Sequence, residues 1–164
     1  MLLQLDFWTY HSRLRRSEKD GQVFVFDPIR RKHVTLTPEE GLRQLVVQYL
    51  LHTKQYPPSH IRVEIGLLLN GMPRRCDIAV FDPHLQPWLL VECKSPKVPL
   101  TQTTFEQVAR YNLTFRAPFL AITNGEATFC AQLDSEHGAF AFLNDFPEYP
   151  LQNAQKPTRA KDLP

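Results

Sequence analysis

The sequence predicts an α/β domain in which helices cover a central β-sheet. Two segments, residues 37–54 and 103–115, have the apolar spacing of amphipathic helices, and several extended runs lie around them. Two of these runs, residues 78–81 and 88–91, are almost continuously apolar, as in strands that are covered on both faces. We therefore expect helices to pack on the sheet.

Length and composition indicate one ordinary domain. The chain has 164 residues with 19 Lys and Arg against 17 Asp and Glu, so its total charge does not indicate a nucleic-acid-binding protein. Three scattered cysteines show neither a disulfide framework nor the paired spacing of a zinc site, which favours a reducing compartment. No signal peptide and no apolar run of about 18 residues is present, so we expect a cytoplasmic protein without a membrane segment.

The domain is expected to occupy residues 23–146. Residues 1–22 are predicted to be a partly mobile lead-in, because residues 11–22 are polar and lack periodicity. A hairpin should follow, with strands at 23–26 and 33–36 around an Asp-Pro turn. Residues 147–164 contain four prolines among polar residues and are predicted to be a disordered tail.

The first long helix, residues 37–54, has a clear start signal. Thr37 is placed as the N-cap, Pro38 at the first helical position and Glu40 three residues after the cap. At about 100° per residue, Glu39 lies at the edge of the apolar stripe and Glu40 points away from it. Glu39 is therefore the candidate functional acid, and Glu40 is interpreted as a capping-box partner.

The strands follow this helix. Extended runs at 61–69, 76–81 and 88–93, with turns at 70–71 and 82–83, predict an antiparallel meander. The helix at 103–115 precedes a strand at 119–123, and residues 128–133 and 139–143 are further candidates to extend the sheet.

Charged residues stand at the ends of two of these strands. Glu92 and Lys94 share one face because side chains alternate along a strand, and the antiparallel neighbour can bring Asp77 beside them. Two carboxylates, with the backbone carbonyl of Cys93, would offer the oxygen ligands that Mg²⁺ prefers. Lys94 would orient the attacking water or neutralise negative charge in the transition state. A surface salt-bridge cluster is the plainer interpretation of the same spacing.

Five stretches occur in an order that resembles a nuclease family. They are residues 37–44, 75–80, 90–96, Gln107 with residues 111–112, and residues 123–125. Together they resemble the PD-(D/E)XK nuclease superfamily, and more closely a stand-alone form of the N-terminal nuclease domain of type I restriction enzyme restriction subunits. The resemblance covers about residues 20–133 and implies a restriction-endonuclease-like fold, a mixed central β-sheet flanked by α-helices.

This resemblance also implies an activity and a set of residues. It implies Mg²⁺-dependent hydrolysis of DNA phosphodiester bonds, with Mn²⁺ as a substitute metal. Asp77 and Glu92 match the metal-binding acids, Glu39 the helix-borne acid that completes the site, and Lys94 the catalytic lysine. Gln107 matches the glutamine that often follows the lysine. Cys76 stands where the family usually has proline.

Partners and alternatives remain open at this point. The chain lacks a Gly-rich phosphate loop, so any ATP-dependent activity would come from a partner. A helicase or translocase, or a methyltransferase, is left open as a partner in trans. A homodimer is also left open. One rival hypothesis is a catalytically inactive nucleic-acid-binding or partner-adaptor module on the same fold, and another is an unrelated α/β interaction protein. Candidate contacts to DNA phosphates, which are otherwise solvated charges, are Arg74, Arg75 and Lys97, with Arg30, Arg31 and Lys32.

Overall fold

A six-stranded mixed sheet forms the centre of the computed structural model, which describes residues 2–69, 72–134 and 139–151. The strands lie in sequential order, and every neighbouring pair is antiparallel except β6 and β7. Their bounds are β4 Ile61–Leu69, β5 Met72–Phe81, β6 Pro87–Cys93, β7 Phe119–Thr123, β8 Thr128–Asp134 and β9 Ala139–Phe142. The predicted meander corresponds to β4, β5 and β6.

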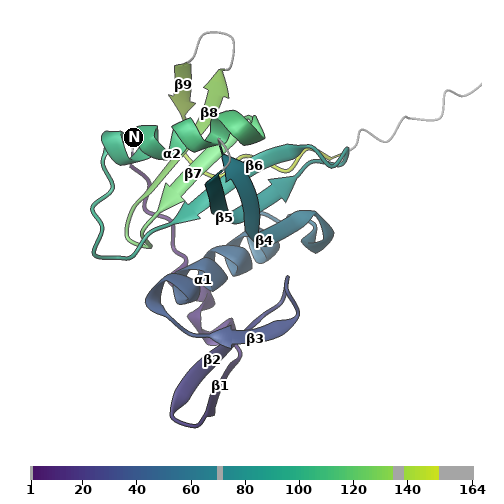
Figure 1. Ribbon diagram of the computed structural model, residues 1–164, viewed down its shortest axis with the longest axis vertical. Helices are drawn as coiled ribbons and strands as arrows, with labels where there is room; N and C mark the ends of the chain where they lie inside the picture. Colours follow the sequence, from purple (N-terminus) through teal and green to yellow (C-terminus); the bar gives the residue numbers. More distant parts are fainter. Residues whose placement is uncertain (1, 70–71, 135–138, 152–164) are drawn as a thin grey trace, which may run out of the picture.

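Two helices, α1 (Pro38–His52) and α2 (Gln102–Phe115), cover this sheet (Figure 1). Successive residues of the central strands enter different cores: Ile78 and Val80 pack with α1, whereas Ala79 packs with α2. Because neighbouring side chains point to opposite faces of a sheet, the two helices lie on opposite faces. The predicted α/β class, with a mixed sheet flanked by helices, is confirmed.

Threonine caps begin both helices. The Oγ1 of Thr37 accepts a hydrogen bond from the Glu40 amide at 3.1 Å, and Thr101 forms a reciprocal capping box with Thr104. The apolar stripe of α1 is buried between the helix and the sheet, as predicted. In the part of the chain that the structure describes, no helix is long and apolar enough to cross a membrane.

A smaller three-stranded antiparallel sheet precedes α1 and projects beyond it, at the lower end of Figure 1. It contains β1 Arg16–Lys19, β2 Gln22–Asp27 and β3 Lys32–Thr35, after a short 3-10 helix η1, Trp8–Arg13. The hairpin of β2 and β3 was predicted, whereas β1 lies in a segment expected to lack regular structure. All four β1 side chains are exposed, so the strand is held by backbone pairing with β2 and leaves no apolar alternation in the sequence.

The chain after β9 returns to the main core. Phe146 is buried, the carbonyl of Pro147 accepts a hydrogen bond from Tyr56, and the Tyr149 ring packs on the rings of Tyr56 and Trp88. The start of the predicted disordered tail is therefore packed, because the Tyr149 ring lies against Tyr56 and Trp88 and the Pro147 carbonyl is hydrogen-bonded. The rest of that tail, 152–164, and the predicted turn at 70–71 lie outside the described residues.

Candidate functional site

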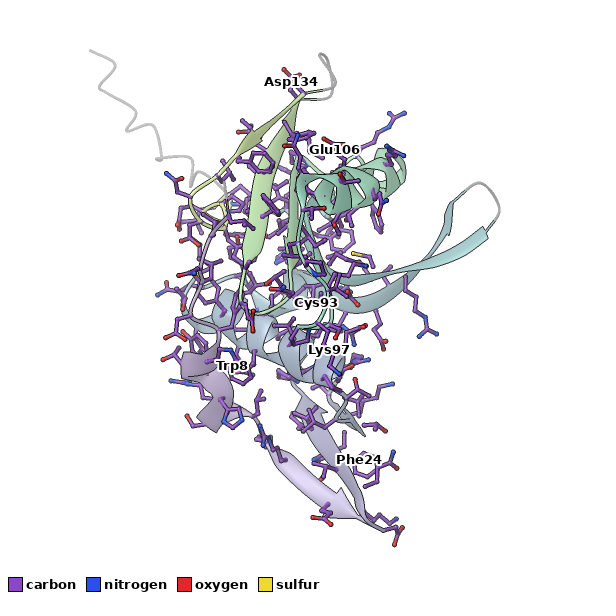
Figure 2. All side chains as sticks on the ribbon, turned by 90° about the vertical axis from the view of Figure 1, so that its left-hand side faces the viewer. Trp8, Phe24, Cys93, Lys97, Glu106 and Asp134 are labelled. Atoms are coloured by element: carbon purple, nitrogen blue, oxygen red, sulfur yellow. The ribbon has the colours of Figure 1, made fainter. Side chains whose placement is uncertain are left out.

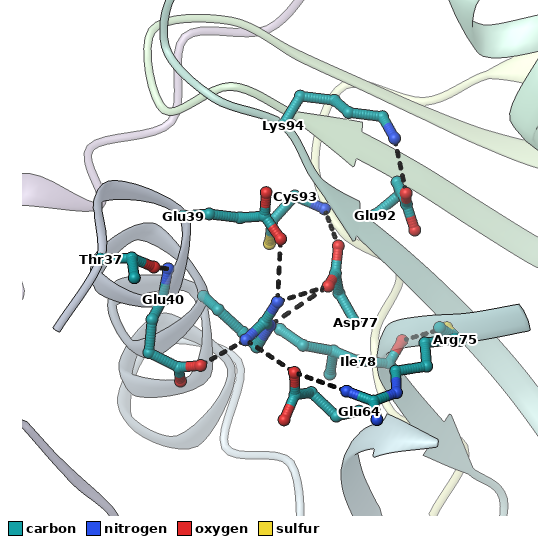
Figure 3. Close-up of polar contacts among 12 residues, drawn as sticks. Thr37, Glu39, Glu40, Glu64, Arg75, Asp77, Ile78, Glu92, Cys93 and Lys94 are labelled. Atoms are coloured by element: carbon teal, nitrogen blue, oxygen red, sulfur yellow. Dashed lines mark hydrogen bonds and ion pairs between the residues drawn. The ribbon is translucent and has the colours of Figure 1, made fainter. Parts of the chain in front are cut away.

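Asp77 and Glu92 stand on neighbouring strands next to Lys94 (Figure 3). Strands β5 and β6 pair Ile78 with Val91, and the two acids are each one residue beyond that pair. Asp77 is buried, and its Oδ2 accepts a hydrogen bond of 2.7 Å from the Cys93 amide. The Nζ of Lys94 donates to Glu92 Oε1 at 2.6 Å. The structure thus brings together the two acids and the lysine that the sequence singled out.

The electrostatics of this group are dominated by its two carboxylates. Burial and repulsion from Asp77 raise the pKa of Glu92, and the hydrogen bond from Lys94 offsets that effect only in part. Partial burial opposes the charge of Lys94, but its hydrogen bond to Glu92 and the charges around it raise its pKa overall. The site therefore carries a repulsion between carboxylates that one ammonium group does not remove.

Arg43 of α1 reaches the same acids from the helix. Its Nη2 donates to Asp77 Oδ1 at 2.7 Å and to Glu39 Oε1 at 3.1 Å, and its Nη1 bonds Glu40. Burial disfavours the Arg43 charge, but the negative charges of Asp77 and Glu40 outweigh burial and raise its pKa. Sequence reasoning missed this residue. Its spacing of three and four residues from the two glutamates, within the 37–44 stretch, was the available signal.

The two glutamates at the start of α1 have different surroundings from those predicted. Glu39 is half exposed, with 52% of its side chain accessible. Glu40 points away from the apolar stripe, as predicted, but it is buried rather than only a capping-box partner. Its carboxylate is held by Arg30 at 2.7 Å and Gln44 at 2.9 Å in addition to Arg43. The N-terminal sheet brings Arg30 over this side of the helix, which local helix geometry does not reveal.

Arg30 belongs to this buried network and is therefore unavailable to bind phosphate. Its side chain is only 14% exposed and pairs with Asp27, Glu40 and Glu64. Asp27 is fully buried, and its Oδ1 accepts the amides of Ile29 and Arg30. Gln44 bonds Asp27 Oδ2 at 2.9 Å. These contacts attach the N-terminal sheet to α1 beside the acids.

Glu64 interrupts strand β4 directly across from Asp77. The ladder pairs Val63 with Ile78 and Ile65 with Cys76, and it skips the position between them. At that position Glu64 has a φ of 51°, a left-handed conformation that is uncommon for residues other than glycine and often marks functional sites. Glu64 lies 3.6 Å from Arg43 and 3.8 Å from Arg75.

The other predicted residues lie at the margin. Gln107 is exposed on α2 and makes no hydrogen bond to an acid in the described part of the chain. The Arg75 side chain is 75% exposed, and Lys97 is exposed in the loop after β6. Arg74 belongs to β5, but its side chain lies outside the described residues. Burial raises the pKa of the Cys93 thiol well above its usual value. The backbone amide of Cys93 is the group that donates a hydrogen bond to Asp77.

The donor set fits Mg²⁺ through two carboxylates. Within residues 2–69, 72–134 and 139–151, no group of three or more His, Cys, Asp or Glu is arranged to hold a metal. Mg²⁺ needs only one or two carboxylates, because water and substrate phosphate fill its other positions. Asp77 and Glu92, whose mutual repulsion a cation would relieve, supply such a pair.

Comparison with known proteins agrees with this geometry. The sequence profile of the family described as "Type I restriction enzyme R protein N terminus" matches residues 38–147, about two thirds of the chain. No curated protein matched. The matched region runs from α1 past β9 and includes Glu39, Asp77, Glu92 and Lys94, whereas the three-stranded N-terminal sheet lies before it.

Proposed function

Because the chain belongs to the type I restriction enzyme R protein N terminus family, we propose that it is a metal-dependent nuclease that hydrolyses DNA phosphodiester bonds. The observation that carries this proposal is the pair Asp77 and Glu92, held together on β5 and β6 beside Lys94. Adjacent carboxylates in a largely buried position are costly unless they are paired or bind a cation. Each carboxylate has a basic partner, Arg43 for Asp77 and Lys94 for Glu92, but the repulsion between the two acids persists, and a bound cation would relieve it.

Each residue has a distinct task in this proposal. Asp77 and Glu92 would hold Mg²⁺, or Mn²⁺ in its place, and the Cys93 amide fixes the orientation of the Asp77 carboxylate. When bound, the metal lowers the pKa of a coordinated water and stabilises the charge that builds on the phosphate. Lys94, which keeps its proton because Glu92 raises its pKa, would orient the water or neutralise that charge.

Three further groups complete the proposed set. Glu39 is accessible at the rim of the site and is joined to Asp77 through Arg43, so we propose it as the helix-borne acid. The Cys93 carbonyl is proposed as a backbone ligand of the metal. Gln107 is proposed to approach the site from α2.

DNA is the proposed partner, together with a helicase, translocase or methyltransferase that acts in trans. Arg75 and Lys97 are exposed near the ends of β5 and β6 and, with Arg74, are the proposed contacts to DNA phosphates. A homodimer is proposed as the arrangement that would place two sites on opposite strands.

Plasmid cleavage tests the activity. Supercoiled plasmid and labelled single strands are incubated with Mg²⁺ or Mn²⁺ and with wild type, Lys94→Met or Glu92→Gln. Arg116→Met is the control, because Arg116 is an exposed basic residue at the C-terminal end of α2 and belongs to none of the proposed contacts. We expect metal-dependent cutting that both site variants lose and the control keeps, at equal folded fractions. A folded wild type that binds DNA in a salt-sensitive way but does not cut would favour the inactive adaptor or a required partner.

A further inference from the structure

Trp8 is exposed although the residues around it are anchored. Phe7, its neighbour, is buried in the main core against Tyr49 and Phe146, so η1 is held firmly on α1. Trp8 itself remains 60% exposed. Its place on this short helix is labelled in Figure 2. A single exposed apolar side chain is ordinary on a protein surface, so its surroundings decide what it signifies.

Trp8 borders a cavity of about 410 Å³ at the start of α1. This volume lies within the range of about 300–1,000 Å³ that is typical of small-molecule sites. The walls are mainly apolar and come from η1, from α1, and from the loops after β6 and β7. They include Trp8, Leu36, Leu42, Leu45, Pro96 and Gly125.

Two features suit this cavity to a flat aromatic ligand with an adjacent negative charge. The rings of Trp8 and His11 lie 5.9 Å apart, and Arg16 Nη2 bonds His11 Nε2 at the mouth. Gly125 lines the wall without a side chain, and a Cβ there would come within 3.2 Å of Leu42 Cδ1. The cavity thus combines an aromatic face, a narrow apolar interior and a cationic edge.

The cavity lies beside the acid site. Leu42 lines the cavity, and Arg43, the next residue of α1, contacts Asp77. On the other wall, Pro96 is two residues beyond Lys94, whose amide donates to the Thr123 carbonyl at 2.8 Å. The acid site and the cavity therefore share the start of α1 and the loop after β6 as walls.

The charge around Trp8 suits a polyanion. Residues 9–20, which follow it, carry four exposed basic side chains against two exposed acids, namely Arg13, Arg15, Arg16 and Lys19 against Glu18 and Asp20. The rest of the cavity edge includes one carboxylate, Glu126, which can accept a hydrogen bond from a base amino group.

We propose that this cavity binds an unpaired nucleobase of a DNA strand that passes the Asp77 and Glu92 site, with the base stacked on Trp8. The proposal rests on the proposed function and names its substrate as a strand that is single-stranded beside the cleaved bond. Stacking on an exposed aromatic ring beside a basic surface is how proteins hold unpaired strands with little sequence preference. Arg16 supplies the cation next to the adjoining phosphate.

Strand binding without metal tests the cavity separately from cleavage. A fluorescein-labelled thymidylate strand of about 12 nucleotides is titrated with the full chain in EDTA, and its anisotropy is recorded. Stacking contributes about 1–3 kcal/mol per base, so Trp8→Ala should weaken binding about 5- to 150-fold. Trp8→Phe should restore most of the affinity. Leu85→Ala, at another exposed apolar residue in the β5–β6 turn, should leave affinity unchanged.

A second probe separates the base from the backbone. A strand of equal length built from abasic units should bind wild type more weakly, and Trp8→Ala should bind the two strands alike. Wild-type affinity in Trp8→Ala, or equal binding of abasic and thymidylate strands by wild type, would overturn the proposal. Trp8-dependent binding by a protein that never cuts would retain the cavity and favour the inactive adaptor or a required partner. If Trp8→Ala leaves both cutting and strand affinity unchanged, the nuclease is retained and the cavity proposal is refuted.

Discussion

Replacing Arg43 by methionine should destabilise the protein strongly. The Arg43 side chain is 5% exposed, and it neutralises the buried carboxylates of Asp77 and Glu40. Methionine keeps much of the apolar stem and removes the charge, so Asp77 loses its cation and Glu40 keeps only Arg30. Removing one partner of a buried ion pair costs about 3–5 kcal/mol. At about 2–4 °C for each kcal/mol in a chain of this size, the Tm should fall by about 6–20 °C.

Urea unfolding followed by circular dichroism measures this loss directly. Arg75→Met is the matched control, because Arg75 is 75% exposed and its ion pair with Glu64 spans 3.8 Å. Its unfolding free energy should stay within about 0.5 kcal/mol of wild type. The double variant Arg43→Met with Asp77→Asn should be more stable than the sum of the single losses predicts, because one unpaired charge is gone. A loss below about 1 kcal/mol in Arg43→Met, or strict additivity in the double variant, would refute the reasoning.

Three further predictions follow from burial and charge. Because burial and a neighbouring carboxylate raise the pKa of Glu92 in the folded state, folded protein binds this proton more tightly than the unfolded chain. The stability that this proton contributes is therefore lost as pH rises from about 4.3 through the raised pKa. Glu92→Gln should therefore match the wild-type Tm near pH 4 and exceed the wild-type Tm at pH 7. The control Glu18→Gln, at an exposed residue, should show no such difference between the two pH values. A lower Tm for Glu92→Gln than for wild type at pH 7 would contradict this prediction. Tyr149→Ala should cost about 1–2 kcal/mol in urea unfolding because its ring packs on buried aromatic rings, and Leu151→Ala, at a residue 82% exposed, should cost almost nothing. Burial raises the pKa of the Cys130 thiol to about 12. This thiol should therefore react with iodoacetamide at pH 8 only after unfolding. Rapid labelling of Cys130 in the native protein would count against its burial.

Much of the main sheet could be predicted because its signals are local. The caps and stripe of α1 and the apolar runs of β5 and β6 each lie within a few residues of sequence. The position of Asp77 and Glu92 beside Lys94 could be predicted from the alternation of side chains along a strand and from one turn. Strand β1 left no such signal, because all of its side chains are exposed and its pairing with β2 is made by the backbone.

The polar network around the acids could not be predicted in the same way. Arg43 and Asp77 are 34 residues apart, and Gln44 and Asp27 are 17 apart. Nothing in local spacing says which acid a given arginine will meet. Glu40 shows the same limit, because its burial depends on Arg30, which a separate sheet delivers.

The side chains of β6 alternate between two cores, and this limits the insertions and deletions that the strand can accept. Leu89 and Val91 belong to one core and Leu90 to the other, and Glu92 continues the same alternation into the site. A slip of one residue would reverse the face of every side chain on the strand. It would exchange the contents of both cores and turn the Glu92 carboxylate to the opposite side of the sheet. Insertions and deletions within this strand should therefore be excluded by folding itself, before any selection on catalysis acts.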